Sequence, residues 1–116
     1  MNKNIQIKKL LADDFDFDKL LWNELRPGVL IHRFYQNDDS ENASAALLKY
    51  DKGASVPIHL HTGYEHLLIL KGEQEDKNGI YQKGDFIINL PGSKHDVKSN
   101  TGCILLAIWE KPVQFI

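Results

Sequence analysis

The stretch from Gly53 to Gly72 reads Gly-Ala-Ser-Val-Pro-Ile-His-Leu-His-Thr-Gly-Tyr-Glu-His-Leu-Leu-Ile-Leu-Lys-Gly. Its first two histidines, His59 and His61, are two residues apart, so on an extended strand both imidazoles project from the same face. Glu65 follows after a tight turn at residues 62–64. Two imidazoles and a carboxylate that converge on one point form a ligand set for a divalent first-row metal ion. The stretch therefore predicts a metal site at adjoining strand ends.

A fourth candidate ligand, His95, ends the segment Gly-Asp-Phe-Ile-Ile-Asn-Leu-Pro-Gly-Ser-Lys-His, which begins at Gly84. The dipeptide Pro91-Gly92 reverses the chain, so we expect His95 to open a new strand. If that strand lies antiparallel to the first segment, His95 points to the same spot as the other ligands. The alternative is that all four residues are ordinary polar groups at strand ends.

Turn signals recur at short intervals through the second half of the chain, which is typical of an all-β sandwich or barrel. They lie at residues 51–53, 62–63, 78–79, 84–85, 91–92 and 100–102. Asn78-Gly79 suits a two-residue hairpin turn, because these residues tolerate a positive φ. We expect Glu73–Asp76 to pair with Ile80–Lys83 across it.

Size and composition indicate one packed domain of ordinary character. The chain has 116 residues, of which 42% are hydrophobic and 26% charged. Its 14 basic and 16 acidic residues form no basic cluster, so we expect no nucleic-acid partner. No apolar run suits a signal peptide or a membrane span, and the single cysteine, Cys103, reads as a small buried hydrophobe. These features predict a cytoplasmic protein without a membrane partner.

The N-terminal residues 1–21 are expected to form an arm, and residues 22–116 a single β-barrel domain. In the arm, Phe15 and Phe17 could anchor the chain to the domain surface or to a partner subunit. The alternative is a loosely held acidic tail. We expect at most one short helix, near Asp18–Leu25.

The two segments that carry the candidate ligands resemble the paired motifs of the cupin superfamily, which folds as a small jelly-roll barrel. Five residues fall at the spacing of the first motif: Gly53, His59, His61, Glu65 and Gly72. Three residues keep their places in the second motif: Gly84, Gly92 and His95. Pro91 lies one residue later than usual, and Ser99 stands where an asparagine is typical. The resemblance implies that His59, His61, Glu65 and His95 bind a metal ion.

A closer resemblance, to the ChrR-type cupins, extends over most of the chain. These include the C-terminal domain of the anti-sigma factor ChrR and several stand-alone proteins. The residues that carry it are Trp22, Pro27-Gly28-Val29, Ala45-Ala46-Leu47-Leu48, the two metal motifs, Gly79-Ile80-Tyr81, Pro91-Gly92-Ser93 and Gly102-Cys103. That family usually has a second glutamate where this chain has His66. Strand neighbours face opposite ways, so we expect His66 outside the ligand set and His32 to be an ordinary polar strand residue.

The resemblance implies a function that depends on the metal ion. Zinc or iron is the first expectation, and manganese, nickel or copper also suits three imidazoles and a carboxylate. Some similar cupins are dioxygenases of small diketones or hydroxyketones, and we expect an apolar barrel lined by Leu67, Ile69, Phe86 and Ile88. The alternatives are a non-catalytic ligand-binding or stress-sensing module and a purely structural metal. As a dioxygenase or as a binding module, the protein would take a small-molecule ligand. We also expect a homodimer.

Overall fold

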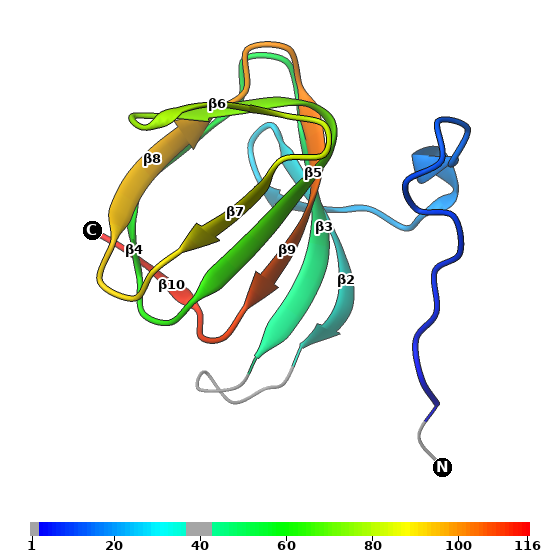
Figure 1. Ribbon diagram of the computed structural model, residues 1–116, viewed down its shortest axis with the longest axis horizontal. Helices are drawn as coiled ribbons and strands as arrows, with labels where there is room; N and C mark the ends of the chain where they lie inside the picture. Colours follow the sequence, from blue (N-terminus) through cyan, green and yellow to red (C-terminus); the bar gives the residue numbers. More distant parts are fainter. Residues whose placement is uncertain (1–2, 37–42) are drawn as a thin grey trace.

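The computed structural model describes residues 3–36 and 43–116, and strands account for most of them (Figure 1). The elements in chain order are the 3₁₀ turn η1 (Phe17–Lys19) and the strands β1 (Asn23–Arg26), β2 (Val29–Gln36), β3 (Ser44–Tyr50), β4 (Ser55–His61), β5 (Glu65–Asp76), β6 (Gly79–Gln82), β7 (Phe86–Asn89), β8 (Lys94–Lys98), β9 (Cys103–Trp109) and β10 (Val113–Phe115). The described residues form no α-helix, and none of them belongs to a helix long and apolar enough to cross a membrane. The predicted all-β jelly-roll fold is confirmed.

The strands form one curled sheet in the order β1-β2-β3-β9-β5-β8-β4-β10, with β6 and β7 also paired to β5 (Figure 1). Every pair is antiparallel. The two ends of this order meet, because the guanidinium carbon of Arg26 in β1 lies 5.4 Å from the ring centroid of Phe115 in β10. The long strand β5 connects the two sides of the barrel, since its first part pairs with β7 and β9 and its last part with β6 and β8.

The hairpin predicted at Asn78-Gly79 is confirmed. β5 and β6 pair across it, with Glu73 opposite Gln82 and Asp76 opposite Gly79. The backbone N–H of Asn78 donates to the Asp76 carboxylate at 2.8 Å, and this side-chain contact stabilises the turn.

The main hydrophobic core lies on the inner face of the barrel. Leu67 and Ile69, which were expected to line it, are 4% and 0% exposed. The same expectation for Phe86 and Ile88 is wrong, because these side chains are 60% and 47% exposed. In β7 they pair with Leu68 and His66 of β5, so they share the outer face of the sheet.

The single cysteine is buried as predicted. Cys103 is 4% exposed and belongs to the core cluster. Burial is the main reason that the pKa of its thiol rises to about 11.

The N-terminal segment packs on the outer face of the same sheet. Phe17, Leu20 and Trp22 contact a cluster formed by Leu47, Leu70 and Ile104. The Trp22 indole N–H donates to the carbonyl of Phe17 at 2.9 Å. Phe15 lies against Phe17, with 4.8 Å between ring centroids. The segment therefore covers part of its own domain.

The expectation of at most one short N-terminal helix is confirmed, although the element is a 3₁₀ turn that overlaps only the start of the expected range Asp18–Leu25. The only helical turn among the described residues is η1, capped by the Asp16 carboxylate, which accepts from the Asp18 N–H at 3.0 Å. Residues 23–26 instead extend the sheet as β1, because the turn at Pro27-Gly28 folds them back along the edge of β2.

Substitution of Gly72 tests how tightly β5 and β9 approach each other. Gly72 has a φ of +72°, and an added Cβ would overlap the Gly102 carbonyl oxygen and lie 2.9 Å from the Cys103 Cα. We expect Gly72→Ala to lower the free energy of unfolding by roughly 3 kcal/mol or more, because backbone atoms cannot move aside cheaply. Urea unfolding followed by circular dichroism measures the loss.

Gly53→Ala is the matched control for this substitution. Gly53 has a φ of +83°, but no atom lies within 4 Å of an added Cβ. This variant should show only the conformational cost of about 1–2 kcal/mol. Equal losses in the two variants would mean that the close approach at Gly72 contributes nothing.

Candidate metal centre

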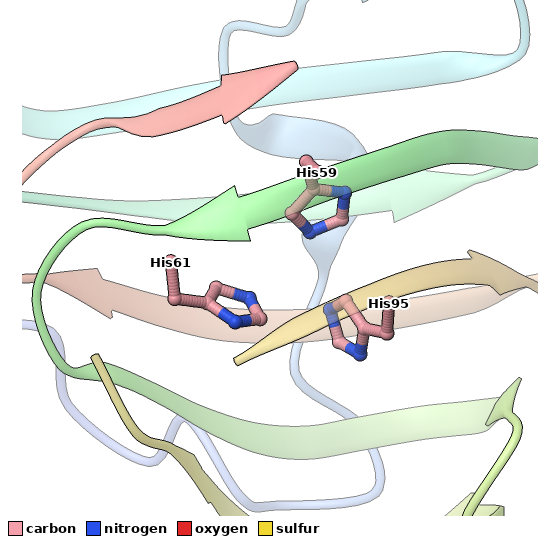
Figure 2. A group of neighbouring side chains, drawn as sticks. All are labelled: His59, His61 and His95. Atoms are coloured by element: carbon pink, nitrogen blue, oxygen red, sulfur yellow. The ribbon is translucent and has the colours of Figure 1, made fainter. Parts of the chain in front are cut away.

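Three histidines from two neighbouring strands point toward one another (Figure 2). β4 carries His59 and His61 on the same face, and β8 places His95 directly opposite His59. The ring centroids are 4.6–5.1 Å apart, and one nitrogen of each ring lies within 4.8 Å of the others. All three side chains are buried, at 2–5% exposure. The predicted approach of His95 to the other two histidines is thus what the structure shows.

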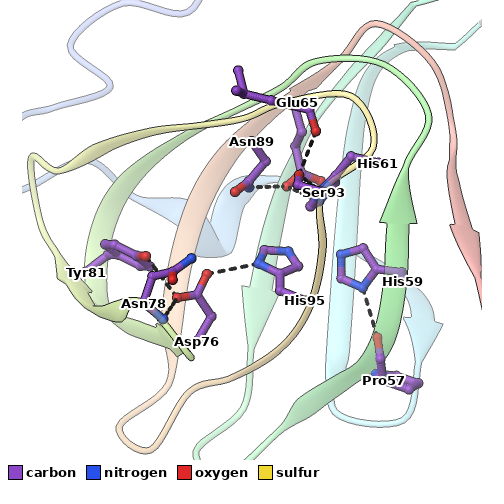
Figure 3. A network of polar contacts seen from close by, with 11 residues as sticks. Pro57, His59, His61, Glu65, Asp76, Asn78, Tyr81, Asn89, Ser93 and His95 are labelled. Atoms are coloured by element: carbon purple, nitrogen blue, oxygen red, sulfur yellow. Dashed lines mark hydrogen bonds and ion pairs between the residues drawn. The ribbon is translucent and has the colours of Figure 1, made fainter.

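Each imidazole uses its Nδ1 atom to bind a group outside the cluster (Figure 3). Nδ1 of His59 donates to the carbonyl of Pro57 and Nδ1 of His95 to the carboxylate of Asp76, both at 2.9 Å. Nδ1 of His61 lies 2.9 Å from the Ser93 hydroxyl oxygen. That hydroxyl donates its own hydrogen to the Leu90 carbonyl at 2.6 Å, so its oxygen accepts from His61.

These contacts leave the Nε2 lone pair of every ring facing the cluster. Fixing Nδ1–H by a second partner is how metal-binding histidines are usually oriented. Nε2 of His61 is buried and has no hydrogen-bond partner among the described residues, which is costly for a polar atom unless something binds it. Burial also lowers the pKa of His59, which keeps that ring neutral. The residues therefore fit a divalent metal ion.

Glu65 lies beside the cluster, at the start of β5. Its Oε1 is 3.2 Å from Nε2 of His61 and accepts from the Asn89 amide at 2.9 Å, and its Oε2 accepts from the Trp109 indole N–H at 2.7 Å. Among the described residues, ligand atoms of the three histidines lie within 4.8 Å of one another, and no Glu65 oxygen belongs to this group. Glu65 as a fourth ligand thus stays a prediction.

The charge of Glu65 results from two opposing effects. Burial acts to raise its pKa, while the hydrogen bonds from Asn89 and Trp109 act to lower it. The net effect is a pKa below the usual value, so the group is a buried carboxylate. Such a charge is stabilised by a cation, which is a second reason that the site suits a metal ion.

Asp76 holds His95 from outside the cluster. Its Oδ1 accepts from the Tyr81 hydroxyl at 2.9 Å and from the Asn78 N–H, and its Oδ2 accepts from His95 (Figure 3). Burial would raise the pKa of Asp76, but these hydrogen bonds lower it overall. The group is therefore a fixed anion that orients the His95 ring.

Sequence reasoning assigned no supporting role to the residues that hold the histidines: Asp76, Tyr81, Asn89, Ser93 and Trp109. Tyr81 and Ser93 are among the residues that carry the family resemblance, and the Asn78-Gly79 turn predicts that β5 ends near Asp76. His66 and His32 lie away from the cluster: His66 stacks on Phe86 at 6.0 Å on the outer face, and His32 Nδ1 contacts the Leu21 carbonyl at 2.9 Å.

A cavity of about 300 Å³ extends from the histidines into the barrel. His59, Glu65 and His95 line one part of it, and most of the remaining wall is apolar. This volume is at the lower end of the range for small-molecule sites. A metal ion held by the histidines would thus face a space that admits a small organic compound.

Comparison with known proteins agrees with this architecture. A model of the family described as "ChrR Cupin-like domain" matches residues 13–113. The comparison with curated proteins gave no significant match. Among solved structures, the Rhodobacter sphaeroides anti-sigma factor ChrR in complex with SigE is similar, with 28% identity and a TM-score of 0.72 over 82% of this chain. The chain spans about half (52%) of that ChrR chain.

Two other solved structures share the fold at lower identity. An RmlC-like cupin from Shewanella frigidimarina has 22% identity and a TM-score of 0.67, covering 84% of this chain and 89% of that one. An acetylacetone dioxygenase from Acinetobacter johnsonii has 14% identity and a TM-score of 0.75, covering 100% of this chain and 83% of that one. The family match confirms the resemblance predicted from the motifs: the chain belongs to the ChrR cupin-like domain family.

Proposed function

We propose that this protein binds a small molecule next to a metal ion held by His59, His61 and His95, with Glu65 as the fourth ligand. The observation that carries the proposal is the cluster of three buried histidines, each with Nδ1 bound outside the cluster, of which His59 and His95 border an apolar cavity of about 300 Å³. A site that only stabilises the fold is normally closed by its protein ligands, whereas His59 and His95 border an open space.

The ligand set favours zinc or iron, with manganese, nickel and copper as further candidates. When bound, such an ion supplies Lewis acidity, and a redox-active one also supplies a site for dioxygen chemistry. The chain itself holds the three rings in one tautomer and places them beside a largely apolar wall. Because Nδ1 of each ring is already bonded, the rings need not reorient when the ion binds.

The first candidate reaction is oxidative cleavage of a small diketone or hydroxyketone. Its support is the apolar cavity beside a three-histidine centre and a fold shared with acetylacetone dioxygenases at 12–14% identity. Diketones chelate metal ions through two oxygens, so they would suit an ion that the protein ligands leave accessible from the cavity.

The second candidate is a non-catalytic module that binds a ligand or senses stress. It is favoured by the similarity to ChrR, which was solved in complex with a sigma factor. In that role the same centre would bind its ligand without turnover. The two candidates make different predictions for oxygen consumption.

Removal of single ligands tests the metal centre. We expect His59→Ala and His61→Ala each to weaken zinc binding by more than about 100-fold, beyond the effect typical of residues outside the ligand set. Zinc competition titrations with a chromophoric chelator give the affinity, and circular dichroism checks that the barrel is folded.

His66→Ala is the matched control, because it removes a histidine from β5 whose ring faces outward. It should keep full zinc affinity. Stoichiometric zinc in His59→Ala or His61→Ala would overturn the site assignment. Glu65→Gln tests the fourth ligand separately: a loss as large as that of the histidine variants supports ligation, and unchanged affinity leaves three histidines as the complete set.

Oxygen consumption separates the two candidate functions. We expect iron-loaded protein to consume oxygen with at least one compound in a panel of β-diketones and hydroxyketones, measured with an oxygen electrode. Zinc-loaded protein should bind the same compound without uptake, since zinc has no redox chemistry. Binding without uptake for every metal would reject the dioxygenase and favour the sensing module.

We also propose that the chain forms a homodimer through an outer patch that consists of His66, Phe86, Ile88 and Ile108. These residues lie side by side on β5, β7 and β9, next to the part of the outer face that the N-terminal segment covers. Phe86, Ile88 and Ile108 are 39–60% exposed. A contiguous apolar patch of this kind usually contacts a partner.

Light scattering tests the dimer. The wild-type mass should be twice the 13.3 kDa chain mass, and Ile88→Lys with Ile108→Lys should give the monomer. Ile80→Lys, at a 54% exposed position away from the patch, is the control and should stay dimeric. A monomeric wild type would remove the proposal.

The proposed location is the cytoplasm. Its support is the lone, buried and unpaired Cys103, which agrees with a reducing compartment. The balance of acidic and basic residues likewise supports a small molecule over nucleic acid as the partner.

A further inference from the structure

We propose that Arg26 is a specificity-determining residue, and that the cavity takes a small anionic compound with a metal-chelating group at one end and a carboxylate at the other. The chelating group binds at the histidines, and the carboxylate pairs with the Arg26 guanidinium. This inference deepens the proposed function and rests on it, because it names the substrate class of the same site.

Arg26 forms part of the cavity wall, where the two edges of the sheet meet. Its guanidinium carbon lies 5.4 Å from the centroid of the Phe115 ring, which is itself 5.7 Å from the centroid of the His59 ring. The two distances together place the guanidinium within about 11 Å of the His59 ring. One small molecule can therefore span the metal centre and the cation.

The N–H groups of the Arg26 guanidinium have no acceptor among the described residues. Across residues 3–36 and 43–116, Arg26 forms no ion pair and its side chain donates no hydrogen bond. Arg26 is half-buried. Burial raises the pKa of nearby Tyr50, and the positive charge of Arg26 opposes this rise in part. A partly desolvated cation without an anionic partner gains strongly from a carboxylate, which accepts two parallel N–H bonds.

The wall between the two ends defines the middle of the ligand. It is formed largely by apolar side chains from five strands: Val29, Ile31, Leu48, Leu67, Val97 and Leu105. The one acidic residue of the wall, Glu65, lies at the histidine end, and its oxygens already accept from Asn89 and Trp109. An aliphatic or aromatic spacer thus suits the centre of the cavity. The wall has two cations, Arg26 and Arg33. Arg26 is half-buried and Arg33 is exposed, so Arg26 gains more from an anionic partner.

A matched pair of β-diketones tests this assignment. 4,6-Dioxoheptanoate has a diketone at one end and a carboxylate at the other, and 2,4-heptanedione has a methyl group in place of that carboxylate. Binding to zinc-loaded protein is measured by isothermal titration calorimetry, so that no turnover disturbs the titration. We expect wild-type protein to bind the acid at least about tenfold more tightly than the neutral diketone.

Substitution of Arg26 should remove that preference. We expect Arg26→Gln to weaken binding of the acid by about tenfold or more and to change binding of 2,4-heptanedione by less than about twofold. Arg26→Lys should restore part of the preference. Lys111→Gln, which removes the same charge from an exposed position outside the cavity wall, is the control and should behave as wild type.

The outcomes separate this inference from the proposed function. Equal wild-type affinity for both compounds, or an equal loss of both in Arg26→Gln, would overturn the role of Arg26 and leave the metal centre intact. Tight, Arg26-dependent binding of the acid that is the same with and without zinc would support Arg26 and reject the metal-chelated ligand. Failure of zinc-loaded protein to bind either compound would reject both, and the wild-type comparison stands even if Arg26→Gln does not fold.

Discussion

The pairing of β4 with β8 is the constraint on which the site depends. It sets His59 opposite His95, and side chains alternate along each strand, so a slip of one residue would turn a histidine to the outside. The register is fixed at both ends of the pair. At one end the backbones of His61 and the Pro91-Gly92 turn exchange bonds, from Gly92 N–H to the His61 carbonyl at 2.8 Å and from His61 N–H to the Ser93 carbonyl at 2.9 Å. At the other end the Gly53 N–H donates to the Ser99 carbonyl at 2.7 Å.

Burial of the histidines links the proposed metal binding to the stability of the fold. Three imidazoles and the Glu65 carboxylate are buried, and Nε2 of His61 has no hydrogen-bond partner in the described structure. An unsatisfied buried polar atom costs free energy, and a bound ion would remove that cost. If the proposed ion binds, its binding energy would therefore add to the folding energy and stabilise the protein.

The parts of the site that lie on one strand, or across one recognisable turn, could be predicted from the sequence. The two-residue spacing gave the common face of His59 and His61, and the Pro91-Gly92 turn gave the direction of His95. Contacts between strands far apart in the chain were missed, as for Glu65 and Trp109, because their register depends on the whole sheet. The expectation that Phe86 lines the barrel was wrong for a similar reason. The apolar run in β7 does not show which of its residues face the core, because this depends on the pairing with β5.

The alternation along β5 explains how one strand serves two surfaces. Glu65, Leu67 and Ile69 face the cavity and core, whereas His66 and Leu68 face outward and pair with Ile88 and Phe86. His66 stands on the outer face, with its ring stacked between the rings of Tyr64 and Phe86 at 6.4 and 6.0 Å. An aromatic ring at this position extends the apolar outer patch, where a carboxylate would interrupt it. Residue 66 therefore belongs to the outer surface and lies outside the candidate metal centre.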